Sequence, residues 1–292
     1  MKLGVIGGSG VYEIEGLQNV CYEAPDTPFG EPSDQYCCAE LNGVELVFLP
    51  RHGRQHRIMP SEINHRANIY GFKALGVDCL ISISAVGSLK ESISPRDIVL
   101  PDQYYDRTKK SLEHTFFGNG VVAHVSMADP TCPSLRETMA ATARDVIKKE
   151  GLPNCVHAGG TYVNMEGPQF STRAESNVYR SHGFDVIGMT SLGEAKLCRE
   201  AEICYQPMAM VTDYDCWHEE AGNVTVEMVM GHLVANTQLA KAIVIELAGQ
   251  VGRERSCSCR SAMESAILTP AAAITDADRE RFGLILARHA DG

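Results

Sequence analysis

The chain has 292 residues, of which 44% are hydrophobic, and a formal net charge of -11. This size allows one large core, and the negative charge argues against nucleic acid or an anionic membrane as the main partner. No apolar run approaches the roughly 20 residues of a membrane span, and the N-terminus reads as a first strand rather than a signal peptide. We therefore expect a cytoplasmic globular protein.

Strand and helix signals alternate along the chain. In order they predict strand 3–6, strand 45–49, helix 62–75 capped by Ser61, strand 79–84, strand 97–100, helix 133–150, strand 159–165, helix 171–181, strand 185–187, helix 192–202, strand 204–212, helix 226–247, and a short helix that begins at Thr275 or Asp276. The inward stripe of helix 226–247 is predicted at Val226, Val229, Met230, Leu233 and Val234. This alternation indicates an α/β fold, a three-layer α/β/α arrangement with a central mixed sheet. We expect residues 1–292 to form a single domain, with a core over about 1–250 and a polar tail and helix at 251–292.

The eleven cysteines are many for a cytoplasmic chain, and none of them form a Cys-x-x-Cys pair. The sequence therefore predicts no metal site, and most of these thiols should be buried. Cys257 and Cys259 differ, because they lie in the polar tail among Arg253, Arg255 and Arg260. Neighbouring cations favour thiolates, so this pair is either a redox clip or two unremarkable thiols.

Four predicted strand ends carry groups that can bind an anion, and ligands of open α/β sheets bind beyond such ends. The groups are Ser9 in the loop Gly7-Gly8-Ser9-Gly10, the pair Arg51 and His52, the pair Ser84 and Ala85, and Thr190. Glycine-rich backbone, hydroxyls, an arginine fork and a histidine ring together predict a phosphate site. A tight turn and a solvated basic loop are the alternatives for the first two. No Mg²⁺ ligand set, dinucleotide fingerprint or Walker lysine accompanies them, so the phosphate is expected to be an inorganic reactant.

Two carboxylates, Asp213 and Asp215, stand one residue apart at the end of the strand predicted at 204–212. Strand side chains alternate with period two, so both should point to the same side. Such a pair can share one proton, or can present one acid and one acceptor to a flat ligand. The alternative is a turn, since aspartate is common at strand ends.

Longer segments match a family. They are Gly-Val-Ile-Gly-Gly-Ser-Gly at 4–10, Thr-Pro-Phe-Gly-Glu-Pro-Ser at 27–33, Arg-His-Gly-Arg-Gln-His at 51–56, Asp-Gln-Tyr-Tyr-Asp-Arg-Thr at 102–108, Glu-Gly-Pro-Gln-Phe-Ser-Thr-Arg-Ala-Glu at 166–175 and Thr-Asp-Tyr-Asp-Cys-Trp at 212–217. On these segments the chain resembles the 5'-methylthioadenosine phosphorylases of the trimeric purine nucleoside phosphorylase superfamily. The resemblance runs from Gly4 to about Leu247 and implies a nucleoside phosphorylase-like fold.

The resemblance also implies a reaction: phosphorolysis of 5'-methylthioadenosine to adenine and 5-methylthioribose 1-phosphate, in purine and methionine salvage. Inorganic phosphate would be a co-substrate, no cofactor would be needed, and the enzyme, a pentosyltransferase, would be a homotrimer or a dimer of trimers. The phosphate-binding residues implied are Ser9, Arg51, His52, Ser84, Ala85 and Thr190, the same set as above. For the nucleoside, the resemblance implies Met189 against the ribose, Phe170 against the purine, Asp213 and Asp215 at the base edge, Val226 and Val229 at the 5'-methylthio group, and His124 in a neighbouring subunit's 5' pocket.

The chemistry of a departing purine fits Asp213 and Asp215. The base leaves as an anion unless N7 is protonated, so Asp213 is the expected acid, with a pKa raised by burial and by Asp215. An ionised Asp215 would accept from the 6-amino group and favour adenine. Two alternatives remain. One is a broader purine nucleoside phosphorylase acting on adenosine, inosine or methylthioinosine; the other is a phosphate or nucleoside sensor without turnover.

Overall fold

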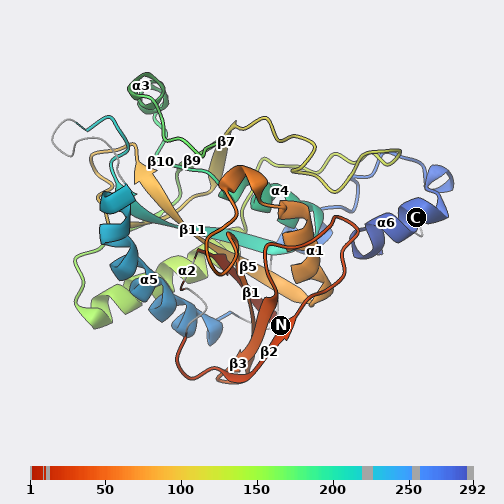
Figure 1. Cartoon of the computed structure of the whole chain (residues 1–292), viewed down its shortest axis with the longest axis horizontal. Helices are drawn as coiled ribbons and strands as arrows, with labels where there is room; N and C mark the ends of the chain where they lie inside the picture. Colours follow the sequence, from red (N-terminus) through yellow and green to blue (C-terminus); the bar gives the residue numbers. More distant parts are fainter. Residues whose placement is uncertain (1, 9, 11–13, 219–225, 252–256, 288–292) are drawn as a thin grey trace.

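The fold is built around one mixed β-sheet (Figure 1). The computed structural model describes the chain apart from residues 1, 9, 11–13, 219–225, 252–256 and 288–292. The strands are β1 (Lys2–Gly7), β2 (Gln18–Glu23), β3 (Tyr36–Leu41), β4 (Val44–Pro50), β5 (Val77–Ser88), β6 (Ile98–Leu100), β7 (Gln103–Arg107), β8 (Val156–Ala158), β9 (Thr161–Met165), β10 (Val186–Gly188) and β11 (Cys204–Asp213). The α-helices are α1 (His65–Ala74), α2 (Pro133–Glu150), α3 (Arg173–Ser181), α4 (Ser191–Glu200), α5 (Val226–Ala248) and α6 (Asp276–Phe282).

The strand order is β2-β3-β4-β1-β5-β10-β9-β7, and β11 pairs with both β5 and β6. Strands β4, β1, β5 and β11 run parallel to one another. Antiparallel pairs occur where β3 meets β4 and where β10 meets β5. The prediction of a central mixed sheet is confirmed.

Helices cover both faces of the sheet. Figure 1 shows α2 and α5 together on one side of the central strands and α1 with α4 on the other. The first pair packs Met139 and Ile243 into one core, whereas the second packs Phe72 and Leu197 into another. Adjacent residues of β1 divide between these cores because strand side chains alternate between faces. The three-layer prediction is therefore confirmed, and none of the described helices has the length and apolar character needed to cross a membrane.

Several predicted boundaries differ from the structure for identifiable reasons. Helix α1 begins at His65 rather than near 62, because the Asn64 side chain accepts from the Ala67 backbone N–H and caps it. Ser61 lies instead in a short 3-10 turn, Pro60–Glu62. Strands β2, β3, β7 and β8 were not predicted. All six residues of β2 are exposed, so it carries no alternation of apolar and polar residues that a sequence reading could detect.

The predicted inward stripe of α5 is wrong for two of its members. Met230 is 53% and Val234 67% exposed. The buried face lies further along the helix, at Leu239, Ala240, Ile243, Val244 and Leu247. Met230 and Val234 therefore do not pack in this core.

The C-terminal tail buries more apolar side chains than its polar composition implies. Met263, Phe282 and Ile285 are buried in the core that α1 and α4 share. Helix α6 begins as predicted, with the Thr275 hydroxyl accepting from the Asp278 backbone N–H. The tail also runs beside an earlier segment, because the His124 N–H donates to the Ala266 carbonyl over 2.7 Å.

Candidate functional site

The site forms where β5 exchanges one neighbouring strand for another. Along one edge, β5 pairs with β1 over residues 77–82 and then with β10 at residues 87–88. The opposite edge pairs with β11 throughout residues 79–87. Among the strands that the structure describes, none consequently lies beside residues 83–86 on the first edge, and Ala85 is exposed there. Such an interruption gives a ligand access to the backbone of a central strand.

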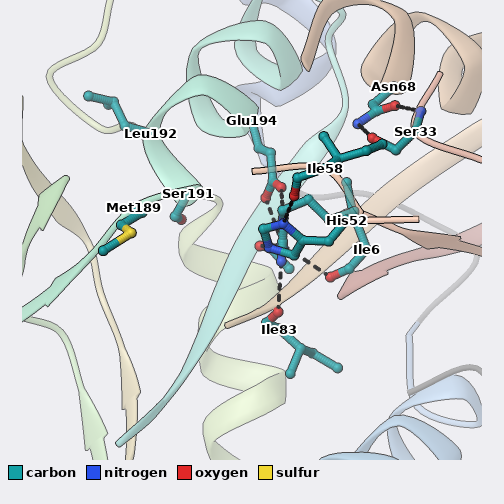
Figure 2. Close-up of polar contacts among 12 residues, drawn as sticks. Ile6, Ser33, His52, Ile58, Asn68, Ile83, Met189, Ser191, Leu192 and Glu194 are labelled. Atoms are coloured by element: carbon teal, nitrogen blue, oxygen red, sulfur yellow. Dashed lines mark hydrogen bonds and ion pairs between the residues drawn. The ribbon is translucent and has the colours of Figure 1, made fainter. Parts of the chain in front are cut away.

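Arg51 lies at this interruption but faces inward. Its side chain is 1% exposed, and Nε donates to Glu194 Oε1 over 2.5 Å. Nη2 donates to Ser82 Oγ over 2.8 Å, and Nη1 donates to the Ile83 carbonyl over 3.1 Å. The acceptors Glu194, Ile6 and Ile83 of this guanidinium are labelled in Figure 2. The Arg51 guanidinium, expected to bind phosphate through two N–H groups, therefore donates to Glu194 instead. Among the described residues, only one N–H of Nη1 is left without an acceptor.

Burial and the Glu194 charge act in opposite directions on this arginine. Burial lowers the pKa of Arg51, but the charge and hydrogen bond of Glu194 raise it, so the guanidinium stays protonated. Glu194 lies in the first turn of α4, where the positive end of the helix dipole favours a carboxylate. The positive charge of Arg51, paired with the Glu194 carboxylate, is thus buried beneath residues 83–86.

The His52 ring is neutral in this environment. Burial first, and the Arg51 charge second, lower the pKa of His52 to about 4. Its Nδ1 lies 2.8 Å from the Ile58 carbonyl, which can only accept, so the ring proton is on Nδ1 (Figure 2). In the neutral ring Nε2 is an acceptor, so the expected donation from a ring nitrogen to phosphate requires a second ring proton and stays a prediction. What remains is the backbone N–H of His52.

Two hydroxyls border the same interruption. Ser84 is 9% exposed, and its Oγ is buried without a hydrogen-bond partner among the described residues. Thr190 is 6% exposed and occupies the N-cap position of α4, yet its side chain forms no capping hydrogen bond. Met189, which precedes it, packs its sulfur against Gly167 so closely that a Cβ there would lie 2.5 Å away. Both hydroxyls are thus available to a ligand at this edge.

Asp213 and Asp215 come together by a turn and not by strand alternation. Asp213 is the last residue of β11, and Asp215 has a φ of 50°, outside strand geometry. The Asp215 backbone N–H donates to Asp213 Oδ1 over 2.8 Å. The expectation that period two aligns the two carboxylates is therefore wrong, although they are neighbours. Both pack on Gly87, where an added Cβ would lie 2.9 Å from Asp213 Oδ1 and 3.3 Å from Asp215 Cβ.

The pKa of each carboxyl is raised above its usual value. Burial raises the pKa of Asp213, and burial followed by the Asp213 charge raises the pKa of Asp215. Asp213 Oδ2 accepts from the Thr212 hydroxyl over 2.7 Å. Asp215 Oδ2 is buried and accepts no hydrogen bond of good geometry among the described residues, although the Ser176 and Ser171 side chains act on this carboxyl and lower its pKa. An unpaired buried carboxyl oxygen is costly, so this atom is a site where a ligand donor would be stabilising.

The loop that carries these aspartates is fixed on two sides. The Trp217 indole N–H donates to the Ser88 carbonyl over 2.7 Å, and the Arg180 guanidinium lies 3.5 Å from the centre of its ring. The Cys216 thiol donates to the Ser171 carbonyl over 3.3 Å. That contact brings the segment of Phe170, a side chain 46% exposed, beside Asp215. The exposed Phe170 therefore belongs to a segment that contacts the loop carrying Asp215.

The structure groups most of the predicted site residues around the second half of β5: Arg51, His52, Ser84, Ala85, Met189, Thr190, Asp213 and Asp215. Val229 is partly exposed in the first turns of α5, a helix that contacts β11 further along, where Asn236 Nδ2 donates to the Val211 carbonyl over 3.0 Å. His124 is exposed and lies against the tail. Ser9 and the side chain of Val226 lie outside the described residues.

Sequence reasoning missed Glu194 and Gly87. A glutamate in the first turn of a helix usually caps it or faces solvent, so nothing in the sequence marks Glu194, which is 0% exposed, as a buried counter-ion. Gly87 stands in a β-branched run, where an isolated glycine can signal close approach of another group. That signal was present at Ala85-Val86-Gly87-Ser88.

The comparisons with known proteins agree with this geometry. Residues 2–248 match the family model of the phosphorylase superfamily. The chain is 53% identical to S-methyl-5'-thioadenosine phosphorylase of Geobacter sulfurreducens over 98% of both chains. It is also 53% identical to the enzyme of that name from Thermosynechococcus vestitus, over 99% of both.

Solved structures show the same relationship. A methylthioadenosine phosphorylase from an antarctic soil metagenomic library has a TM-score of 0.91 and 44% identity, over 97% of this chain and 98% of that one. Methylthioadenosine phosphorylase from Schistosoma mansoni in complex with adenine has a TM-score of 0.84 and 35% identity, over 92% and 99%. The predicted nucleoside phosphorylase-like fold is confirmed. The chain belongs to the phosphorylase superfamily, and within it to the S-methyl-5'-thioadenosine phosphorylases.

Proposed function

We propose that this chain cleaves 5'-methylthioadenosine with inorganic phosphate, giving adenine and 5-methylthioribose 1-phosphate. The single observation that carries the choice of base is the buried Oδ2 of Asp215, which accepts no hydrogen bond of good geometry among the described residues, beside an Asp213 whose pKa is raised. An adenine supplies what this pair needs: a 6-amino donor for Asp215 and an N7 acceptor for the proton of Asp213. A 6-oxopurine would place an acceptor against an acceptor. Transfer of a sugar from a purine to phosphate makes the chain a pentosyltransferase.

At the base end, Asp213 is the catalytic acid. As the bond between C1' and N9 breaks, its electron pair moves into the purine, and the proton of Asp213 passes to N7. The base then leaves neutral. The Thr212 hydroxyl, which donates to Asp213 Oδ2 over 2.7 Å, also lies 3.3 Å from the Val86 carbonyl. It can therefore donate to that carbonyl instead when Asp213 is protonated.

At the other end, a phosphate oxygen attacks C1' from the interruption in β5. The groups placed to hold it are the Ser84 hydroxyl, the backbone N–H of Ala85, the backbone N–H of His52, and Thr190 at the N-terminus of α4, with Ser9 as a further proposed contact. Helix N-termini and unpaired backbone N–H groups favour anions. Arg51 contributes its charge and its one remaining N–H from beneath. Holding phosphate under the sugar gives the proximity that this displacement requires.

The sugar lies between these two ends in the proposed complex. Ser84 and Gly87 are three residues apart on β5, or about 10 Å, a span that a ribose with its base can bridge. Met189 would contact the ribose and Phe170 the purine. The exposed apolar residues at the start of α5, including Val229 and Met230, would face the 5'-methylthio group together with Val226. An apolar 5' pocket favours a methylthio group over a hydroxyl.

We further propose that the chain assembles as a homotrimer or a dimer of trimers, with His124 completing a neighbour's site. Support comes from the surface beside His124, where Val122 is 47% and Leu268 63% exposed. These two residues are adjacent, because the Leu268 N–H donates to the Val122 carbonyl over 2.9 Å. Exposed apolar neighbours of this kind are typical of subunit contacts.

The test is the phosphate dependence of base release. Initial rates of adenine release from 5'-methylthioadenosine should rise with phosphate and saturate, and mass spectrometry should find the sugar 1-phosphate in equal amount. Ser84→Ala should raise the KM for phosphate while leaving the KM for nucleoside nearly unchanged, and Ser265→Ala, at an exposed tail position, should change neither. Free methylthioribose formed at the same rate without phosphate would overturn the proposal. A higher kcat/KM on methylthioinosine would favour the broader phosphorylase.

A further inference from the structure

Four cysteines from three separate parts of the chain converge away from the proposed active site. They are Cys132, Cys204, Cys257 and Cys259, and their Sγ atoms all lie within 4.8 Å of one another. Cys132 is the N-cap of α2, Cys204 is the first residue of β11, and Cys257 and Cys259 come from the tail. No disulfide joins them. A pair formed by Cys257 and Cys259 alone, one of the two alternatives from their sequence, would not include Cys132 and Cys204.

The spacing of the sulfur atoms suits a tetrahedral ion. A Zn–S bond is about 2.3 Å, which puts the sulfurs of a regular tetrahedral site about 3.8 Å apart. The contact between Cys204 Sγ and Cys257 Sγ is 3.3 Å, far longer than the S–S bond of about 2.05 Å in a disulfide. Four thiols at this separation with no ion would crowd sulfur against sulfur. Tetrahedral S₄ sets are typical of zinc.

The surroundings compensate negative charge. The Leu135 backbone N–H donates to Cys132 Sγ over 3.5 Å, so this sulfur caps an 18-residue helix at its positive end. Arg199 Nη1 lies 4.0 Å from Cys259 Sγ. Four buried aliphatic side chains at the positions of these cysteines would gain nothing from such contacts.

We propose that Cys132, Cys204, Cys257 and Cys259 bind one Zn²⁺ as four thiolates. All four positions are filled by protein, so the site is structural and leaves no open position for a substrate. Binding releases the protons that the thiols carry, and no sulfur is oxidised. The absence of a Cys-x-x-Cys pair does not exclude the site, because the ligands are assembled by the tertiary fold.

The ion would connect the tail to the middle of the chain. Cys257 and Cys259 open the tail segment that later packs against residues 121–126, where the Ala266 carbonyl accepts from the His124 N–H. Cys132 and Cys204 belong to α2 and β11, whose packing forms the core. A zinc ion here would therefore hold the tail in place, and with it the surface that carries His124.

The test is the metal content of the full-length chain purified without added metal or chelator. Native mass spectrometry and elemental analysis should find one zinc per chain, and cobalt added in place of zinc should give the absorption of a tetrahedral thiolate site. Cys257→Ser should lose most of the zinc and lower the unfolding temperature. Cys21→Ser, at an exposed cysteine outside the cluster, should keep both.

Other results would contradict the zinc proposal. Zinc-free protein in which two or four of these cysteines resist alkylation after denaturation without reductant, because they are joined in disulfides, would overturn the proposal in favour of oxidation. Zinc-free protein with four reactive thiols, or full zinc retention in folded Cys257→Ser, would also overturn it. If Cys257→Ser does not fold, the cobalt spectrum and zinc content of the unaltered chain still decide. None of these readouts depends on phosphorolysis.

Discussion

The Asp215 backbone N–H donates to Asp213 Oδ1 over 2.8 Å, so the residue proposed to select the base also orients the proposed acid. Asp215 reaches this position with a φ of 50°, a conformation that side-chain-bearing residues adopt infrequently. A chain keeps such a conformation where surrounding contacts determine it. Here the contacts of Trp217 and Cys216 hold the same loop on both sides.

Asp213→Asn should reduce turnover of 5'-methylthioadenosine by about 100- to 10,000-fold, the usual contribution of a general acid. Phosphate binding should survive, because Asp213 lies at the other end of the site. The acid acts only when protonated. In the unaltered enzyme the rate should therefore fall as the pH rises through the raised pKa of Asp213.

The same pH profile measured on Asp213→Asn should lack that basic limb. Steady-state rates from neutral to alkaline pH, with each sample returned to neutral pH to confirm stability, are the measurement. An unchanged basic limb in the variant would assign the titration to another group.

Asp215→Asn should weaken the preference for methylthioadenosine over methylthioinosine by roughly one to two decades. Loss of a buried acceptor that faces an amine costs about 1–3 kcal/mol, and the asparagine amide can donate to a 6-oxo group. The ratio of kcat/KM for the two nucleosides, compared between variant and unaltered enzyme, measures this directly. An unchanged ratio would remove Asp215 from base recognition.

Glu194→Gln should destabilise the chain by about 3–5 kcal/mol, the usual cost of leaving a buried charge without its partner. The uncompensated ion is Arg51, which is 1% exposed. The matched control is the double variant Arg51→Met with Glu194→Leu, which removes both charges and should lose much less stability. Urea unfolding curves distinguish the two. Equal losses would mean that packing, not charge, is what Glu194 contributes.

Stability should depend on pH through Glu200. Burial raises the pKa of this carboxyl from 4.5 to about 7, although it accepts from the Thr115 hydroxyl and the Phe116 N–H. A raised folded-state pKa contributes stability that is complete below the unfolded value near 4.5 and is lost as the pH rises through about 7. The corresponding free energy is at most about 3 kcal/mol.

The difference in unfolding free energy between the unaltered chain and Glu200→Gln should therefore change over this pH window and level off above it. Glu264→Gln, at an exposed position, should show no such change. A difference that is constant with pH would place the titration elsewhere.

His124→Ala should weaken binding of the 5' substituent far more than it slows turnover at saturation. The reason is the proposed place of His124 in a neighbouring subunit's pocket. The KM for methylthioadenosine should rise relative to that for 5'-deoxyadenosine, which lacks the methylthio group. Sedimentation of the unaltered enzyme should give a trimer or its double, and a fully active monomer would contradict the assignment.

The sequence was sufficient to predict the layered fold, because long strands such as β5 and helices such as α2 carry strong periodic patterns of apolar residues. It was also sufficient to choose the residues around β5, since each follows a predicted strand. It could not show that Arg51 turns inward, because its partner Glu194 lies 143 residues away. Nor could it show that Cys132 and Cys204 meet the tail, because contacts of that kind follow from packing and leave no local pattern.

The unpaired stretch of β5 sets a fixed distance. The proposed phosphate side begins at Ser84 and the proposed base side at Gly87, and the three peptide units between them belong to a strand paired with β11 on its other edge. Loop movements can open or cover the site, but they cannot change this spacing. An inhibitor that joins an anionic group to an adenine-like ring should therefore gain most when its linker matches this strand segment, and rigid linkers should outperform flexible ones of the same length.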